Sequence, residues 1–412
     1  MRKVFIICYF ALAAIILTSF FESCKRNSID DSTVLKSSYT NDPNFASLST
    51  AIIVAQNVNR STIVLKSEDK ANEKAAAYLG TRKIKDNLTI LDKDKQNPYF
   101  YVFNYEAGGF AIISADKRQI PFVGFCDQGY FNKDSIPLGL NNWFETSASY
   151  IQHLRISNAK QSKYVSNQWF SLQGSQNQLK NAPVDPPLPD DYISTVTVGP
   201  LLTTNWGQDN NSYCPALSGG PNGHALTGCS TTAIAQVMAF WKYPANYNWS
   251  AMAANSSDAI AVLMGDIFPC VIDKYNTGAS SCMNDFHVTH TFLNRFNYSS
   301  ASLAGNVNGL IYNGGYKYQT VENNLDARQP VILGAFTSNV NILNLTAFPT
   351  GTGHMWVCDG YRETIFSIET YLSFHMNWGW NGSYNGWYAF NDWSTANGSY
   401  NYCADMIYNI HP

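Results

Sequence analysis

The chain has 412 residues, 45% of them hydrophobic, and its formal net charge is only −3. This length exceeds one ordinary domain, and the hydrophobic content is enough for two cores. The charge is nearly balanced and no basic run occurs, so nucleic acid is not expected as a partner. Residues 201–412 contain 6 Lys and Arg against 12 Asp and Glu, and eight of the ten tryptophans, which is typical of a tightly packed domain with an aromatic-lined cleft.

Residues 1–24 have the layout of a secretory signal peptide. Arg2 and Lys3 precede an uncharged apolar run over residues 4–21, which is just long enough to span a membrane. Ser23 and Cys24 close the run, and a small residue before cysteine resembles the lipobox of bacterial lipoproteins. Cys24 is therefore a candidate for lipidation, with a plain signal peptide or an uncleaved anchor as alternatives. In each case we expect a mature chain outside the cytoplasm, anchored to the membrane or secreted.

The next part of the chain is expected to be a small α+β unit followed by a linker. Residues 25–49 are rich in Ser, Asn and Asp without a period, which indicates a tether. Helices are predicted over residues 67–79 and 143–156. Aromatic and β-branched runs predict antiparallel strands, with a Gly108-Gly109 turn, over residues 99–105, 110–114 and 122–125. An exposed linker over residues 158–191 is predicted from its polar composition and from Pro183, Pro186, Pro187 and Pro189.

Beyond the linker, helices are expected first and strands later. A loop over residues 203–208 precedes a helix after Cys229, whose apolar face is formed by Ile234, Val237, Met238 and Trp241 and which Pro244 ends. Two further helices are predicted over residues 258–267 and 286–296. Strands are predicted over residues 330–334, 353–361 with a turn at Asp359-Gly360, 365–368, 371–380 and 387–390. This order predicts a two-lobed α+β domain with a cleft between its lobes.

Cys229 is the residue around which we expect the chemistry to be organised. It lies just before the first turn of its helix, where free N–H groups and the helix dipole favour a thiolate and lower the pKa of the thiol. Gly228 leaves room for a substrate to approach. The plain alternative is that Cys229 is a small buried hydrophobic residue that happens to precede a helix.

A nucleophilic cysteine needs an imidazole and a group that orients it, and the sequence offers both. His354 follows a glycine-containing loop at the start of a predicted strand, and Asn377 lies on a neighbouring one. The Asn377 side chain is expected to accept a ring N–H of His354, with Trp378 shielding that bond. His354 and Asn377 follow Cys229 by 125 and 148 residues, close to the spacing of about 130–150 residues in papain-like enzymes. Gln208 is expected to form an oxyanion hole with the backbone N–H of Cys229.

Four stretches carry a resemblance to a narrower family, namely WGQ at residues 206–208, GCSTTAIAQVMAFWKYP from Gly228, GHMWVCDGY from Gly353 and FHMNWGWNGSYNGWY from Phe374. They look like the streptopain-type cysteine peptidases over residues 196–410, and residues 99–131 resemble the propeptide of that family. The resemblance implies a papain-like catalytic domain made as a zymogen, with Cys229 as nucleophile and His354 as acid and base.

The resemblance also implies a division of the chain and a substrate cleft. Residues 1–24 are then the signal peptide, 25–190 the inhibitory propeptide with its Pro-rich linker, and 191–412 the catalytic domain. Gly353 and Ser281 are expected to line the substrate cleft, with Trp378 beside them. Around Ser281 the sequence departs from the Gly-Ser-Ala-like stretch of the relatives, since residues 278–282 read GASSC.

The remaining cysteines and histidines have ordinary explanations. Seven cysteines follow Cys24, an odd number that leaves at least one free thiol outside the cytoplasm, and Cys229 is our candidate for it. Cys270 and Cys282 are a possible bridge. His287 and His290 lack a second pair of ligands, which favours a surface helix over a metal site. No metal and no cofactor are expected.

Three hypotheses of function follow. The first is a cysteine endopeptidase that cleaves protein or peptide substrates, has its own propeptide as intramolecular inhibitor, and is held at the membrane by an N-terminal lipid. The second is a surface binding protein built on an inactive peptidase fold, which would have no need of Gln208, Cys229, His354 and Asn377 together. The third, another Cys-His hydrolase such as a cell-wall amidase or a transglutaminase, is disfavoured by the motif order.

Overall fold

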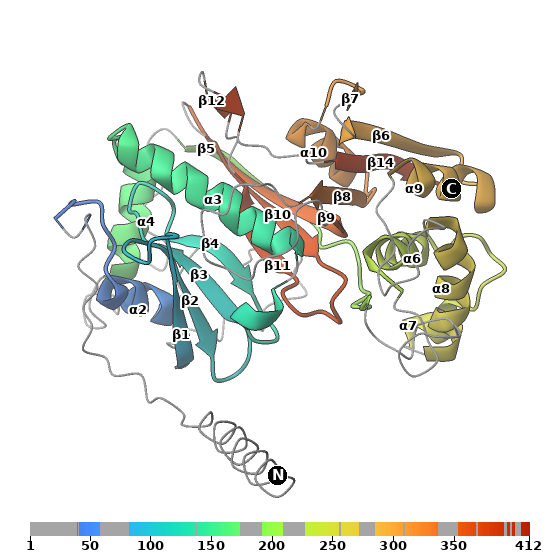
Figure 1. Ribbon diagram of the computed structural model, residues 1–412, viewed down its shortest axis with the longest axis horizontal. Coiled ribbons are helices and arrows are strands. Elements are labelled where there is room, and N and C mark those ends of the chain that lie inside the picture. Colours follow the sequence, from blue (N-terminus) through green and yellow to red (C-terminus); the bar gives the residue numbers. More distant parts are fainter. Residues whose placement is uncertain are drawn as a thin grey trace, which may run out of the picture. The chain divides into compact units, whose positions relative to one another are not determined.

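An antiparallel sheet connects the N-terminal and C-terminal parts of the chain (Figure 1). The computed structural model describes residues 39, 41–57, 82–136, 138–173, 192–208, 227–254, 257–271, 285–307, 310–315, 317–336, 353–367, 370–390, 394–395, 398–399 and 405–412. These residues belong to one compact unit that begins at Ser38. No described helix combines the length and the apolar character that a membrane span requires.

The main sheet has the strand order β1-β2-β3-β4-β11-β10-β9-β8-β14-β6-β7, and β5 pairs with β9. Its strands are β1 (Ile84–Leu91), β2 (Pro98–Tyr105), β3 (Phe110–Ser114), β4 (Phe122–Cys126), β5 (Tyr192–Val198), β6 (Ser300–Val307), β7 (Leu310–Tyr312), β8 (Val331–Phe336), β9 (Gly353–Phe366), β10 (Thr370–Asn377), β11 (Gly386–Phe390) and β14 (Asp405–His411). A separate hairpin is formed by β12 (Ser394–Thr395) and β13 (Gly398–Ser399).

The helices fall into three stretches of the chain. Those before β5 are α2 (Leu48–Gln56), α3 (Leu138–Ile156) and α4 (Lys163–Gln173), with a short 3-10 turn η4 (Lys133–Ser135). Those between β5 and β6 are α6 (Cys229–Trp241), α7 (Trp249–Ala253), α8 (Ser257–Val271), α9 (Asp285–His290) and the π-helical turn η7 (Thr291–Arg295). The last is α10 (Tyr318–Asp326), before β8.

The predicted N-terminal α+β unit is confirmed. Strands β2, β3 and β4 cover the three predicted runs, and every residue of β2 is buried. A strand without an exposed face needs cover on both sides, which explains its continuous aromatic and aliphatic sequence. Helix α2 packs against β2 and β3, and α3 extends across the sheet as far as β8 and β9 (Figure 1). The predicted helix over residues 67–79 lies outside the described residues.

The two parts of the sheet meet where β4 pairs with β11. Phe125 is opposite Trp387 and Gly124 is opposite Tyr388, so hydrogen bonding continues from the N-terminal strands into the C-terminal ones. A side chain on Gly386 would collide with the carbonyl oxygen of Phe125, so only glycine permits this close approach. The N-terminal unit is therefore an extension of the C-terminal sheet.

Strand β9 separates two hydrophobic cores. Because side chains alternate along a strand, Met355 and Val357 face the core that contains α6 and α8, and Trp356 and Cys358 face the core that contains α3. His354 has the parity of Trp356, and its ring stacks on that of Trp356 with centroids 5.9 Å apart. Helices before sheet and an α+β architecture are thus confirmed for the C-terminal part, with α6 and α8 close to the predicted bounds.

Several local predictions were wrong. Asp359 and Gly360 form no turn, because β9 continues through them with a bulge opposite His375 and Met376. Part of the predicted linker is helix α4, held by the buried side chains of Val165, Trp169 and Leu172. The predicted helix over residues 286–296 changes to a π-helical turn at Thr291. The four linker prolines lie outside the described residues.

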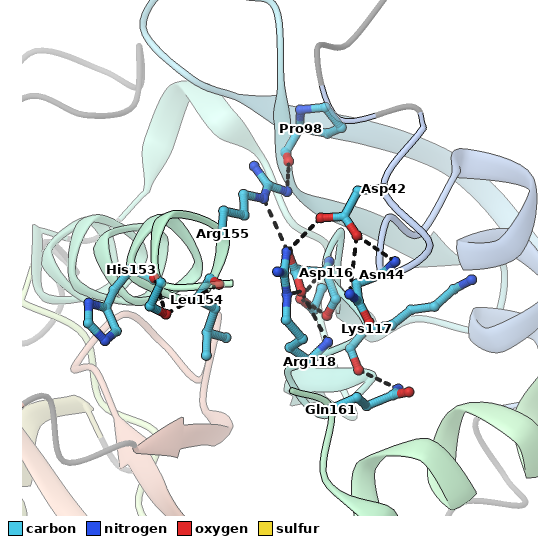
Figure 2. A network of polar contacts seen from close by, with 12 residues as sticks. Asp42, Asn44, Pro98, Asp116, Lys117, Arg118, His153, Leu154, Arg155 and Gln161 are labelled. Atoms are coloured by element: carbon cyan, nitrogen blue, oxygen red, sulfur yellow. Dashed lines mark hydrogen bonds and ion pairs between the residues drawn. The ribbon is translucent and has the colours of Figure 1, made fainter. Parts of the chain in front are cut away.

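A buried ionic network ties the start of the described chain to α3 (Figure 2). Asp116 accepts hydrogen bonds from both Arg118 and Arg155, and Arg118 also reaches Asp42, 3.0 Å away. Arg155, on the last turn of α3, donates to the carbonyl oxygen of Pro98 as well. The two carboxylates, Asp116 and Asp42, balance the two guanidinium groups, so little buried charge is left uncompensated, which such a site requires.

Candidate active site

Cys229 is the first residue of α6 and is 7% exposed. Gly228 precedes it with φ 76°, a left-handed conformation that suits glycine. The backbone N–H of Met355 and the N–H and hydroxyl of Ser230 lie close enough to the thiol to act toward a lower pKa. Contrary to the expected lowering at a helix N-terminus, the pKa of the Cys229 thiol is raised, because its burial outweighs these donors. In this state the residue is a neutral thiol.

His354 lies beside that contact, since it directly precedes Met355 on β9. It is 3% exposed, and its Nε2 lies 3.1 Å from the carbonyl oxygen of Trp378. A carbonyl only accepts, so Nε2 carries the proton and Nδ1 holds the lone pair in the neutral ring. Burial lowers the pKa of His354 to about 4, against a smaller opposing effect of the Trp378 bond. Cys229 and His354 are thus both uncharged in this structure.

Asn377 does not bond His354, which corrects the expected triad. Its Oδ1 accepts from Gln236 Nε2 at 3.1 Å and from the backbone N–H of Gly379 at 3.3 Å. Its Nδ2 donates to the carbonyl oxygen of Thr204 at 2.8 Å. The side chain is fully engaged on the side of α6, and the next residue, Trp378, supplies the oxygen that orients the imidazole. No sequence pattern points to a backbone carbonyl as a partner.

Gln208 is held between the two segments that carry the pair. Its backbone N–H donates to Gly379 O at 2.9 Å, and its carbonyl accepts from Gly228 N at 3.3 Å and from Thr227 Oγ1 at 2.7 Å. The loop of residues 203–208 is therefore anchored both to the segment after Trp378 and to the residue before Cys229. Its side chain has no hydrogen bond to any residue that the structure describes.

The face of the sheet that carries His354 is covered by α3. A side chain on Gly139 would come within 2.5 Å of the Trp378 ring and 2.9 Å of the Trp356 ring, so α3 lies directly on both indoles. Trp143, one turn further along, donates to Ala389 O at 2.9 Å and packs edge-on against Tyr388. The imidazole of His354 lies beneath these rings, away from solvent.

The other candidates are placed as follows. Gly353 begins β9, directly before His354. His287 and His290 are exposed on α9, and the described residues contain no group of three potential metal ligands. Cys270 is a free thiol that donates to Asp266 O. Ser281, Cys282 and Cys24 lie outside the described residues.

The contact between His375 of β10 and Asp359 of β9 was not predicted from the sequence. His375 Nδ1 lies 2.6 Å from Asp359 Oδ1, and Asp359 is the extra residue of the β9 bulge. The second carboxylate oxygen accepts from the backbone N–H of Leu202 at 3.0 Å. The pair fixes the chain just upstream of residues 203–208.

Two family models match separate parts of the chain. A sequence model of the Peptidase C10 family matches residues 206–388, and one of the Spi protease inhibitor matches residues 49–151. The thiol protease/hemagglutinin PrtT of Porphyromonas gingivalis is 24% identical over 71% of this chain, and the match spans only 34% of PrtT. Streptopain of Streptococcus pyogenes is 22% identical over 76% of this chain and 80% of its own length.

The fold has a relative of known structure. A fragment of prointerpain A from Prevotella intermedia superimposes with a TM-score of 0.50 and 22% identity, over 79% of this chain and 99% of the fragment. An inhibitory domain whose sheet continues into a cysteine peptidase domain defines the class of protein: a thiol peptidase with its propeptide attached. The match to the Peptidase C10, or streptopain, family thus extends over residues 206–388 of this chain.

Proposed function

We propose that this chain is the latent precursor of a cysteine endopeptidase in which Cys229 is the nucleophile and His354 the acid and base. The observation that carries the proposal is the placement of the Cys229 thiol, at the start of α6, close to the backbone N–H of Met355, the residue that follows His354 on β9. In an open site, Nδ1 of His354 is the ring atom free to take the thiol proton, because Nε2–H is held by Trp378 O.

The reaction then proceeds in two steps. The Cys229 thiolate attacks the scissile carbonyl carbon, and His354 protonates the leaving amine. Water next hydrolyses the thioester, and His354 accepts its proton. The oxyanion is assigned to the backbone N–H of Cys229 and to the side-chain amide of Gln208, whose backbone is fixed beside Gly228. Asn377 acts on this machinery indirectly, through its contacts with Gln236 and Thr204.

Latency follows from the cover over His354. Helix α3 packs on Trp356 and Trp378 and excludes water from the imidazole of His354. A desolvated thiol and a desolvated imidazole do not form an ion pair. We assign residues 25–190 to the inhibitory propeptide and 191–412 to the catalytic domain. Because α4 ends at Gln173 and β5 begins at Tyr192 within the sheet, the activating cut is assigned to residues 174–191.

The substrate cleft and the location of the enzyme are proposed from the sequence resemblance. Gly353 and Ser281 would line the cleft, and Trp378 would reach substrate only after α3 has left, since its ring is buried. Residues 1–24 would direct export, and lipidation of Cys24 would hold the enzyme at the membrane outside the cytoplasm.

Alkylation of Cys229 by iodoacetamide at mildly acidic pH tests the proposal. We expect slow alkylation of the precursor and fast alkylation, with hydrolysis of a fluorogenic peptide, once residues 174–191 are cut. The alternative, a binding protein on an inactive fold, predicts slow alkylation and no hydrolysis both before and after the cut. Active full-length protein with no cleavage on a gel would contradict the latency.

A further inference from the structure

Gln236 lies two helical turns after Cys229 on α6 and is completely buried. Its Oε1 accepts from Thr204 Oγ1 at 3.0 Å and from the backbone N–H of Trp206 at 3.2 Å. Its Nε2 donates to Asn377 Oδ1 at 3.1 Å. The hydrogen bonds of Thr204, Gln236 and Asn377 form a closed ring, because the Thr204 carbonyl oxygen accepts from Asn377 Nδ2 at 2.8 Å.

Backbone groups determine the orientation of both amides. The N–H of Trp206 can only donate, so it selects the oxygen of Gln236 and leaves the Gln236 amino group toward Asn377. The N–H of Gly379 likewise selects Asn377 Oδ1, and the Thr204 carbonyl selects Asn377 Nδ2. The direction of the Gln236–Asn377 bond therefore does not depend on assigning amide atoms that look alike.

Gln236, Thr204 and Asn377 join the three segments of the site. Gln236 belongs to α6, the helix that begins at Cys229. Thr204 and Trp206 belong to the loop that leads to Gln208. Asn377 directly precedes Trp378, whose carbonyl oxygen holds His354. The nucleophile helix, the oxyanion loop and the support of the imidazole thus meet at one buried amide.

We propose that Gln236 is a positioning residue of the catalytic site, which sets the placement of the Trp378 carbonyl and of Gln208 relative to Cys229. The proposal rests on the function proposed above. Gln236 touches no reacting atom and acts through Asn377 and Trp206. A misplacement of about 1 Å in a catalytic group can lower turnover on the order of 100-fold. A single amide in this place can therefore have a large effect on turnover.

The competing explanation is that Gln236 only stabilises the fold, as any satisfied buried amide does. The chain offers a matched control in Asn324, which is buried on α10. Its Nδ2 donates to Thr320 O at 2.8 Å and its Oδ1 accepts from Asn409 N at 2.7 Å, which ties α10 to β14. Gln236→Glu and Asn324→Asp make the same chemical change, because each replaces a buried amino donor by an oxygen that faces an acceptor.

The experiment uses full-length precursors with a site for a sequence-specific protease placed within residues 174–191, so that processing does not depend on activity. After cleavage, Gln236→Glu is expected to lower kcat about 100-fold near neutral pH while KM changes less than about threefold. Activity should recover toward acidic pH, because the introduced carboxyl, once protonated, again donates to Asn377 Oδ1. Gln236→Met should lose kcat without that recovery.

Asn324→Asp should lower the melting temperature comparably and leave kcat and its pH profile unchanged. The inference is overturned if Gln236→Glu and Gln236→Met keep the kcat of the unsubstituted enzyme, or if Asn324→Asp loses as much. If the unsubstituted, cleaved enzyme hydrolyses no peptide, the proposed function fails instead. In that case the Gln236 inference fails with it, whereas normal hydrolysis with no effect of Gln236 removes the inference alone.

Discussion

His354 donates its Nε2–H to the backbone carbonyl oxygen of Trp378, 3.1 Å away, and the side chain of Asn377 is turned to the opposite side, toward Gln236. The orienting group of the imidazole is thus a main-chain atom, which no side-chain substitution at position 378 removes. What substitution can change is the placement of that carbonyl, through the residues on either side of it.

Replacing Cys229 or His354 should abolish peptide hydrolysis. Cys229→Ala removes the nucleophile, and His354→Ala removes the group that carries its proton, so each should lower turnover to the background of the assay. Cys229→Ala should also accumulate at full length if the precursor cleaves itself, as seen on a gel. Residual activity of Cys229→Ala equal to that of the unsubstituted protein would show that another residue is the nucleophile.

Gln208→Ala should lower the rate of peptide hydrolysis and leave the reactivity of the Cys229 thiol largely unchanged. Loss of one oxyanion donor is expected to lower kcat by about 100-fold or more, whereas alkylation of Cys229 by iodoacetamide develops no oxyanion and should continue at a similar rate. Both rates are measured on the cleaved enzyme. An equal fall in both would mean that Gln208 holds the site together, through its backbone contacts with Gly228 and Gly379.

Gly139→Val should weaken the latent state. The added side chain would collide with the rings of Trp356 and Trp378, and overpacking of this kind costs about 1–3 kcal/mol. If that cost lifts α3, alkylation of Cys229 in the uncut precursor should accelerate by about 5- to 140-fold. Gln152→Leu, at an exposed position of α3, is the control and should leave the rate unchanged.

Glu322 should make the stability of the protein fall as pH rises. Burial, and then the charges of Glu363 and Asp326, raise the pKa of Glu322 to about 7. The folded state therefore binds this proton more tightly than the unfolded state does. The contribution is fully present below about pH 4.5 and is lost as pH rises to about 7. Glu322→Gln should reduce the fall in melting temperature between pH 5 and 8, and an unchanged fall would contradict the assignment.

Asp116→Asn should destabilise the N-terminal unit. The change leaves the buried Arg118 and Arg155 without their common counter-charge, and breaking a buried ion pair in this way costs about 3–5 kcal/mol. Urea unfolding in a Cys229→Ala background measures the effect without self-cleavage. Asp134→Asn, which removes the partner of Lys133 in an exposed pair, should change the stability by less than about 1 kcal/mol.

Local patterns were enough to predict most elements around the site. Helix α6 follows from the 3.6-residue recurrence of its apolar residues, and β2, β3 and β4 from short aromatic and β-branched runs bounded by turns. The spacing and order of Cys229 and His354, together with four motifs, indicated the family. These features depend on residues that are close in the sequence, or on patterns that relatives share, and both can be read before the chain is folded.

The tertiary structure alone decided how the parts meet. The pairing of β4 with β11, the cover of α3 over Trp356 and Trp378, and the turning of Asn377 toward Gln236 join residues more than 100 positions apart. Hydrogen bonds of this range depend on which buried donors and acceptors remain after the strands have paired, and a single sequence does not contain that information. Burial likewise reversed the expected pKa shift of Cys229, because desolvation depends on the whole fold and outweighs the local field of one helix end.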